Sequence, residues 1–543
     1  MLKRFTITFC LLTIATIHIR AQTSDLGKVE FPTSGSPKAQ SHFLRGLAAL
    51  HSFWYEEALE AFRESTRIDP DFMMGYWGEA MAHNHPLWSE QDSPSARSVI
   101  AKIKDTPKTT ARERAYLNAV KLLYGEGDKS ARDRAYSEAM EKIYREYPDD
   151  LDAAAFYSLS LLGLVDYSGK SYRLQARAGA IALDVYQKNP NHPGAAHYII
   201  HAFDDPEHAI LALPAARRYA SIAPEAHHAR HMPSHIFLQL GMWSDAAASN
   251  ESAWAASEAW MKRKNLSPSV RDYHSLHWLL YVYLQQGRYK KAEELLGIMK
   301  KTMTETTYEN KLRPGYYESN YANMAAAFVI ETERWDLAAK LFPETPEGGP
   351  TASTPAAGAH GSHGASQPAS SDVTVRVSRG QRLPVWVRGI AASHNGTSKP
   401  PVEANTGGSS GTGVGMLQVM ALQMSADKQF DKATELMQKA VELEEQMGPP
   451  SGPPGNIKPS HELYGEILLA AGKPADATKQ FQISLLRQPN RARSLLGMAR
   501  AAERSGDKQA AMENYLKLLE QWKHADPDLP ERLEAENYLK TAR

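Results

Sequence analysis

Cysteine is almost absent from this chain, which has 543 residues and a single cysteine, Cys10. A lone cysteine excludes disulfide bridges within the chain. Because Cys10 lies in an N-terminal segment that we predict to be removed, a transition-metal site in the mature chain must use histidine or carboxylate ligands. Net charge is absent as well, since 62 Lys and Arg balance 62 Asp and Glu. No overall field therefore favours a nucleic acid or an anionic membrane surface as partner.

Long hydrophobic runs are missing beyond the N-terminus. There, an apolar run over 5–17 follows two basic residues and is succeeded by Ala21 and a polar continuation. The run is shorter than the ~20 residues of a spanning helix, so it is typical of a cleaved signal peptide covering 1–21. A short uncleaved anchor is the alternative, because Ile19 suits a cleavage site poorly. We expect an exported protein, periplasmic or extracellular, with no membrane span in the mature chain and no nucleic-acid partner.

What the chain does contain is a helical repeat. In the stretch "LRGLAALHSFWYEEALEAFRESTRIDP" small and large apolar residues fall at Gly46, Ala58, Phe62 and Ser65, and Pro70 closes it. The same register returns at Gly241 and Ala246, at Gly287 and Ala292, at Gly472, Ala477 and Phe481, and at Gly506, Ala511 and Tyr515. Weaker copies begin near residues 72, 111, 150, 193 and 319. This spacing resembles the tetratricopeptide repeat (TPR), a 34-residue helix-turn-helix unit.

The resemblance implies an all-α fold, a TPR-type solenoid with a right-handed superhelical twist. Segments rich in Gly, Ser, Pro and Thr interrupt the repeats, and their low apolar content predicts disorder. Between them, residues 373–393 are compatible with either a short strand pair or a helix fragment. We predict a signal peptide over 1–21, a linker over 22–37, an N-terminal array over 38–343, a low-complexity insertion over 344–413 and a C-terminal array over 414–543.

Histidines gather in the middle of the N-terminal array, where eight of the twenty lie between residues 192 and 235. In the repeat register His197 and His201 occupy positions 5 and 9, and His231 and His235 occupy the same positions one repeat later. Residues four apart share one helix face. In the TPR family these positions line the concave groove, and neighbouring first helices pack at ~8–10 Å. Four imidazoles are thus expected to converge on one point.

Other groove positions add to this cluster: His228 and His274 at position 2, His277 at position 5 and Tyr281 at position 9. Pro233 lies between His231 and His235, where it either breaks a helix at a functional site or simply begins one. Within "FDDPEHA", Asp205 suits a helix cap before Pro206, while Asp204 or Asp205 are alternatives for orienting a ligating imidazole.

Without thiolates, such a cluster suits copper, zinc, nickel or iron, and the usual affinity order favours copper. The histidines therefore predict a metal site at His197, His201, His231 and His235, joined by His228 and His277. A groove that hydrogen-bonds an anionic or peptide ligand is the alternative, as is a cluster with no specific role.

Two weaker sets of groove residues remain open between binding and structure. Glu79, His83 and His85 are compatible with a second site or with packing and capping. Glu462 and Glu466 occupy positions 5 and 9, and suit a cation, acid–base chemistry, a basic peptide or solvent alone. "HELYG" lacks the second histidine of an HExxH motif, because residue 465 is glycine. Arg491 and Arg493 are interpreted as a solvated helix start, with a carboxylate grip as the alternative.

The strings "YWGEAMAHNHPLW", "HMPSHIF" and "HELYGE" also resemble a group of exported bacterial TPR proteins, a likeness that implies fold and export but no reaction. Two hypotheses follow. In the first, the solenoid binds a transition metal through its histidine cluster, with metalloenzyme activity left open. In the second, it is a metal-free scaffold that holds a peptide or protein partner in the concave groove.

Overall fold

The computed structural model describes residues 25–166, 171–305, 315–343, 379–396, 413–448 and 450–542. The predicted signal peptide and most of the predicted insertion fall outside these ranges. Within them the chain is all-α, as expected, and its strands are confined to one short antiparallel pair, β1 (Asn84–His85) and β2 (Glu90–Gln91).

The first part of the array is a series of helical hairpins, in which the two helices of each pair contact each other. The pairs are α1 (Pro37–His51) with α2 (Tyr55–Ile68), α3 (Met73–Met81) with α4 (Ser93–Ile100), α5 (Ala111–Leu123) with α6 (Lys129–Glu146), α7 (Leu151–Gly163) with α8 (Arg173–Lys188), and α9 (Pro193–Ala202) with α10 (Ala209–Ile222). A short 3-10 helix, η1 (Pro86–Trp88), lies between β1 and β2.

The hairpins continue through the middle of the chain. Here α11 (His227–His231) and α12 (Pro233–Gln239) together pack on α13 (Trp243–Lys264), α14 (Tyr273–Gln285) packs on α15 (Tyr289–Glu305), and α16 (Tyr316–Thr332) precedes α17 (Ala338–Leu341). The 3-10 helices η2 (Pro268–Val270) and η3 (Trp335–Leu337) stand before α14 and α17.

A single helix, α18 (Arg379–His394), occupies the region for which the sequence left a strand pair or a helix open. It packs between α16 and the first C-terminal helix. The C-terminal helices are α19 (Val414–Ala426) with α20 (Phe430–Glu445), α21 (Ser460–Ala470) with α22 (Pro474–Arg487), α23 (Ala492–Arg504) with α24 (Lys508–Gln521), and finally α25 (Pro530–Thr541).

Glycine sets how closely neighbouring helices approach. The buried Phe62 ring of α2 lies against Gly46 of α1 and Gly78 of α3, and a Cβ at Gly78 would overlap the ring. In the C-terminal part, Gly465 and Gly497 contact the Phe481 ring in the same manner. Each aromatic ring therefore joins two adjacent hairpins, which is how the small-residue register predicted from the sequence becomes a stack.

Glycine also forms the turns inside hairpins. Gly241, Gly287, Gly472 and Gly506 have φ between 65° and 78°, the left-handed region that only glycine enters without strain. The equivalent residue of the first repeat is Phe53, with φ of 52°. A bulky side chain in that conformation costs roughly 1–2 kcal/mol, so the first repeat keeps Phe53 at a conformational cost.

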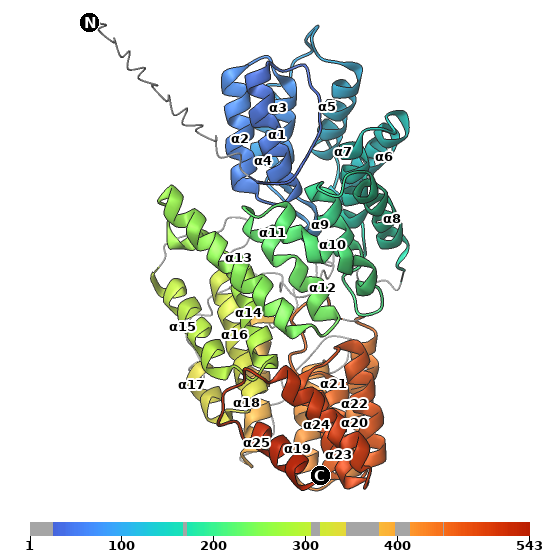
Figure 1. Ribbon diagram of the computed structural model, residues 1–543, viewed down its shortest axis with the longest axis vertical. Coiled ribbons are helices and arrows are strands. Elements are labelled where there is room, and N and C mark those ends of the chain that lie inside the picture. The colour runs from blue at the N-terminus through green and yellow to red at the C-terminus, as the bar shows by residue number, and fades with distance from the viewer. Residues whose placement is uncertain are drawn as a thin grey trace, which may run out of the picture.

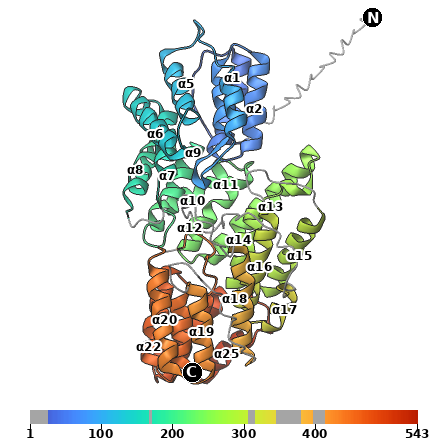
Figure 2. The same ribbon diagram turned by 180° about the vertical axis from the view of Figure 1, so that it is seen from behind.

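The two predicted arrays lie against each other. Helices α1–α8 occupy one end of the molecule, while the C-terminal helices lie beside α14–α18 at the other end (Figures 1 and 2). The Trp522 indole N–H donates to the Gln285 carbonyl at 3.0 Å, and the Trp243 indole N–H donates to the Asn490 carbonyl at 2.8 Å. The N-terminal segment expected as a linker is packed too, since Leu26 and Phe31 are buried.

Replacing Gly78 with alanine is expected to lower the free energy of unfolding by about 1–3 kcal/mol, because the new methyl group overlaps the Phe62 ring. Gly297→Ala is the matched control. Gly297 also lies inside a helix, α15, but no atom stands within 4 Å of a Cβ there. It should stabilise the chain by about 0.5–1 kcal/mol. Urea unfolding measures both, and equal effects would contradict the close-approach argument.

Candidate functional site

Six histidines meet where α9, α11, α12 and α14 come together. They form a first group, His197, His201 and His228, and a second group, His231, His235 and His274. Within each group one ring nitrogen of every histidine lies within 4.8 Å of the others. The groups are neighbours, because ring centroids are 5.9 Å apart both between His201 and His235 and between His228 and His231.

The structure thus divides the expected four-histidine site in two. Both predicted pairs hold, since the Nε2 atoms of His197 and His201 are 3.0 Å apart and those of His231 and His235 are 3.1 Å apart. A third histidine joins each pair, His228 in the first group and His274 in the second. His277, expected as a ligand, lies in neither group, and burial lowers its pKa to about 4. His274, one turn earlier in α14, takes that place.

Pro233 begins a helix, which was the simpler of the two interpretations. The chain divides at Met232, and Pro233 is the first residue of α12. Its missing N–H falls where a helix has no internal acceptor, so the proline adds no lost hydrogen bond. His231 therefore ends α11 and His235 stands in the first turn of α12, yet their rings still meet.

Hydrogen bonds fix which nitrogen carries the proton in the second group. His231 Nδ1 lies 2.6 Å from Asn250 Oδ1, and the amide nitrogen of Asn250 donates to the Ala246 carbonyl, so the Asn250 oxygen must accept. His235 Nδ1 lies 2.6 Å from an Asp204 carboxylate oxygen, which accepts as well. Both Nδ1 atoms are thus donors. In neutral rings both Nε2 atoms carry bare lone pairs, and these face each other at 3.1 Å.

Such a contact is not a hydrogen bond between neutral imidazoles. A proton placed between the rings would make it one, but burial lowers the pKa of both His231 and His235 to about 3. Near neutral pH the two lone pairs therefore face each other without a proton between them.

The first group has a related geometry. His197 Nδ1 donates to the His51 carbonyl at 2.7 Å, leaving the Nε2 lone pair bare. That nitrogen lies 3.0 Å from Nε2 of His201 and 3.2 Å from Nε2 of His228. One lone pair faces two neighbours. Burial lowers the pKa of His197 to about 3 and that of His228 well below its usual value.

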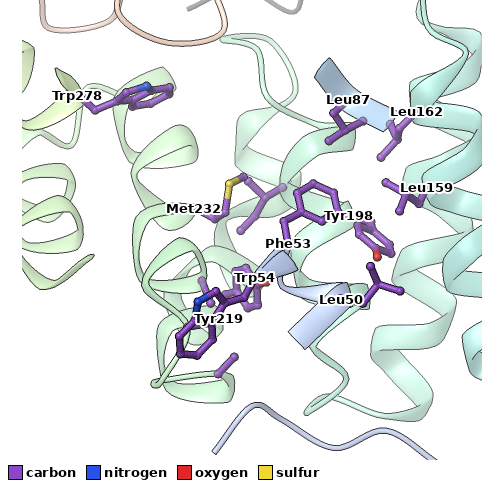
Figure 3. Packing of buried hydrophobic residues seen from close by; sticks show 14 of the residues in the cluster. Leu50, Phe53, Trp54, Leu87, Leu159, Leu162, Tyr198, Tyr219, Met232 and Trp278 are labelled. Atoms are coloured by element: carbon purple, nitrogen blue, oxygen red, sulfur yellow. The ribbon is translucent and has the colours of Figure 1, made fainter. Parts of the chain in front are cut away.

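Aromatic rings close over the histidines instead of leaving the open groove that the sequence suggested. The Phe53 ring centroid lies 4.3 Å from that of His197, and the Trp278 ring lies 4.1 Å from that of His235. Figure 3 shows Met232 close to Phe53, with Trp278 farther off on the other side of Met232. Five of the six grouped histidines, His197, His201, His228, His231 and His235, are at most 8% exposed.

Phe53, whose φ angle is positive, lies against the first histidine group. Its ring also stacks on His201 and His228, with centroids 5.9 and 5.7 Å apart. A glycine at this turn would relieve the backbone but expose the first group. The cost at Phe53 thus accompanies a covered histidine site.

A third cluster, His51, Asp152 and His192, escaped the sequence analysis. His51 Nε2 lies 2.8 Å from Asp152, and its Nδ1 lies 2.9 Å from the Tyr198 hydroxyl. His192 Nδ1 accepts from the Ala195 N–H, so its proton sits on Nε2, which faces Asp152 at 3.4 Å. Burial alone would raise the pKa of Asp152, but its bonds to His192 and His51 bring it below the usual value.

The third cluster differs from the other two, because its imidazoles direct protons and not lone pairs at Asp152. Position 13 of the first repeat, which is His51, is a groove position and was the available signal. It links to the first group, since the His51 carbonyl is the acceptor for His197.

Asp205 caps a helix and Asp204 orients an imidazole, so each of the two roles considered for these residues belongs to one of them. Asp205 accepts from the backbone N–H of Glu207 and of His208 ahead of α10, as a local cap. Asp204 instead orients His235, and its second oxygen accepts from the Gln239 amide at 3.2 Å.

The set Glu79, His83 and His85 does not come together as one site. Glu79 accepts from Arg63 at 2.7 Å, and the His85 ring stacks on Tyr55 at 3.9 Å. His83 Nδ1 lies 4.0 Å from Asp92. These contacts agree with the packing interpretation.

Glu462 and Glu466 are paired with cations from their own chain. Arg491 donates to Glu462 at 2.7 Å and Lys458 reaches Glu466 at 2.5 Å, so the open carboxylate pair considered from the sequence is neutralised. Arg491 also binds Glu331 at 2.6 Å and donates to the Tyr281 hydroxyl at 3.0 Å. The solvated interpretation of Arg491 was wrong, because its side chain is fully buried.

No helix among the described residues is both long enough and apolar enough to cross a membrane. The chain matches none of the curated proteins. Among solved structures it is similar to the APC/C hetero-tetramer Cut9-Hcn1 (10% identity, TM-score 0.31, 94% of this chain and 78% of that one). It is also similar to yeast Tom70 (12%, 0.30, 91% and 92%) and to the P58(IPK) TPR domain (11%, 0.21, 93% and 99%).

At these TM-scores the three likenesses carry no argument about function. The family model for the tetratricopeptide repeat matches residues 39–72, which are α1, α2 and the turns that flank them. Hairpins of the same kind continue through the described chain. Residues 39–72 thus match one tetratricopeptide repeat, and the described chain has the all-α helical-hairpin architecture that such repeats form.

Proposed function

We propose that this protein binds transition-metal ions through its two histidine groups. The observation that carries the proposal is the pair of bare Nε2 lone pairs, on His231 and His235, that face each other at 3.1 Å. Two nitrogens bound to one ion at about 2.0–2.1 Å lie roughly 2.9–3.4 Å apart, depending on the coordination angle. The Nε2 separations of 3.0 Å and 3.2 Å in the first group and of 3.1 Å between His231 and His235 fall in that range, so these nitrogens need little rearrangement to admit an ion.

The hydrogen-bond acceptors around these histidines also support metal binding. Metal-ligating histidines usually donate their other ring N–H to a carboxylate or a carbonyl, which fixes the tautomer. His235 donates to Asp204, His231 to Asn250 and His197 to the His51 carbonyl. The low pKa values keep these rings neutral, which is the form that binds a metal.

An all-imidazole site suits copper, zinc, nickel or iron, and the affinity order for divalent ions favours copper. Three protein ligands leave a coordination position for water or another small molecule. Catalysis by such an ion is compatible with this arrangement, but no residue identifies a substrate. We infer export from the apolar segment 5–17, which also fits a chain without thiolate ligands.

A second candidate function, holding an extended peptide, has one observation in its favour. Residues 450–459 of the chain itself run between α20 and α21 without helical structure and lie against the N-terminal array. The Gln239 amide donates to the Pro450 carbonyl at 2.8 Å, and Gly452 lies against the Trp278 ring. The N-terminal array thus already holds one extended Pro- and Gly-rich segment of its own chain, in the way that a peptide partner would be held.

Metal content tests the first proposal. The full chain, purified without an affinity tag or chelator, is expected to contain copper, zinc, nickel or iron by elemental analysis. His231→Gln/His235→Gln should lose the metal of the second group, whereas His524→Gln, a change at an exposed histidine far from both groups in sequence, should not. Circular dichroism establishes that each variant is folded. No metal in the native protein, and none bound after each ion is added, would refute the proposal.

Asp204→Asn is expected to weaken metal binding by 10- to 100-fold, because the neutral amide orients His235 poorly and lowers its basicity. Asp205→Asn is the matched control, since the neighbouring carboxylate contacts only backbone N–H groups and His208. Competition against a chromogenic chelator gives both affinities. Equal losses in the two variants would contradict a specific role for Asp204.

The stability of the metal-free protein should fall as the pH drops from about 6.5 towards 3. Burial lowers the pKa of His197, His231 and His235 to about 3, whereas the unfolded histidines titrate near 6.5 and so bind protons first. Each such histidine contributes a slope of about 1.4 kcal/mol per pH unit within that window.

Urea unfolding between pH 7 and pH 4 measures this slope, and His231→Gln/His235→Gln should reduce it. The window avoids His227, for which burial alone would lower the pKa but the bond to Asp272 raises it. That pair loses its contribution only as the pH rises above the ordinary histidine range. A free energy of unfolding that stays constant from pH 7 to pH 4 would show that the buried rings do not titrate as argued.

A further inference from the structure

The two histidine groups are close enough for ions bound in them to sense each other. His201 of the first group and His235 of the second have ring centroids 5.9 Å apart. With metal–nitrogen distances of about 2.0–2.1 Å, ions bound to these two rings cannot be more than about 12 Å apart.

One short helix serves both groups. His228 and His231 stand three residues apart on α11, and the first points its Nε2 at His197 while the second points its own at His235. Their rings are 5.9 Å apart. An ion that fixes one end of α11 therefore positions the ligand at its other end.

The two groups are also alike in their proton arrangement, which separates them from the third cluster. His197, His231 and His235 donate through Nδ1 and keep a lone pair on Nε2, so the first group presents at least one such lone pair at its centre and the second presents two. In the third cluster the His51 N–H donates to Asp152 at 2.8 Å and the His192 N–H faces the same oxygen at 3.4 Å, so protons occupy the directions that an ion would need. The expected number of ions is thus two, and not one or three.

We propose that the two groups form a single two-metal centre, with one ion held by His197, His201 and His228 and the other by His231, His235 and His274. This inference rests on the proposed metal binding and adds the number of ions and their coupling. Two divalent ions within about 12 Å repel each other by enough to weaken the second binding step about tenfold even at the dielectric constant of water, and more in a buried site.

Electron paramagnetic resonance of the full chain loaded with copper(II) tests the proposal. Native mass spectrometry should find two ions per chain, and the spectrum should show dipolar broadening from the neighbouring copper ions. Loading with one equivalent each of copper(II) and diamagnetic zinc(II) should diminish the broadening while two ions remain bound.

Two variants separate the groups. His197→Gln/His201→Gln and His231→Gln/His235→Gln should each keep one ion and lose the broadening. The ion that remains in the variant lacking the tighter group should bind at least tenfold more tightly than the second ion of the native chain, because its charged neighbour is gone. If a double variant does not fold, the single changes His228→Gln and His274→Gln replace it.

The outcomes distinguish this inference from the function on which it rests. One ion per chain, or two ions without broadening, would overturn the two-metal centre and leave metal binding intact. No bound ion would overturn both. Two ions with broadening that persists in both variants would place the second ion outside these groups and also overturn the inference.

Discussion

Contact between an aromatic ring and glycine on the neighbouring helices is the constraint on which the rest of this structure depends. Phe62 lies between Gly46 and Gly78, and Phe481 between Gly465 and Gly497. These contacts keep the first helices of successive hairpins at a constant spacing. Side chains one repeat apart in sequence become neighbours in space where hairpins stack, and His201 of α9 and His235 of α12, which are 34 residues apart, meet in this way.

The repeat and the histidine pairs were readable from the sequence because both depend on local spacing. The glycines at four of the turns and the i, i+4 step on one helix face are short-range properties. The division of the histidines into two groups could not be predicted from the sequence. Whether His274 or His277 completes a group depends on how α14 is rotated against α12, and that rotation is set by packing of residues such as Trp278 on His235.

Long-range partners were also beyond the sequence. His51 meets Asp152 across 101 positions, and Arg491 meets Glu331 across 160. Arg491 looked like a solvated helix start because nothing nearby marks it as buried. It lies at the seam between the arrays, where Glu462 and Glu331 compensate its charge. A buried cation without both carboxylates would be costly, so this network favours one docking arrangement of the two arrays over others.

The rings that cover the histidines have a kinetic consequence. Phe53 and Trp278 lie in van der Waals range of His197 and His235, so they narrow the path by which a solute reaches these two rings, and movement of this packing widens it. Local opening of packed elements takes microseconds to seconds, far slower than diffusional encounter. Whatever the histidines hold will therefore exchange at a rate set by the motions of the first hairpin and of α14. A bound species would stay for long periods even at moderate affinity.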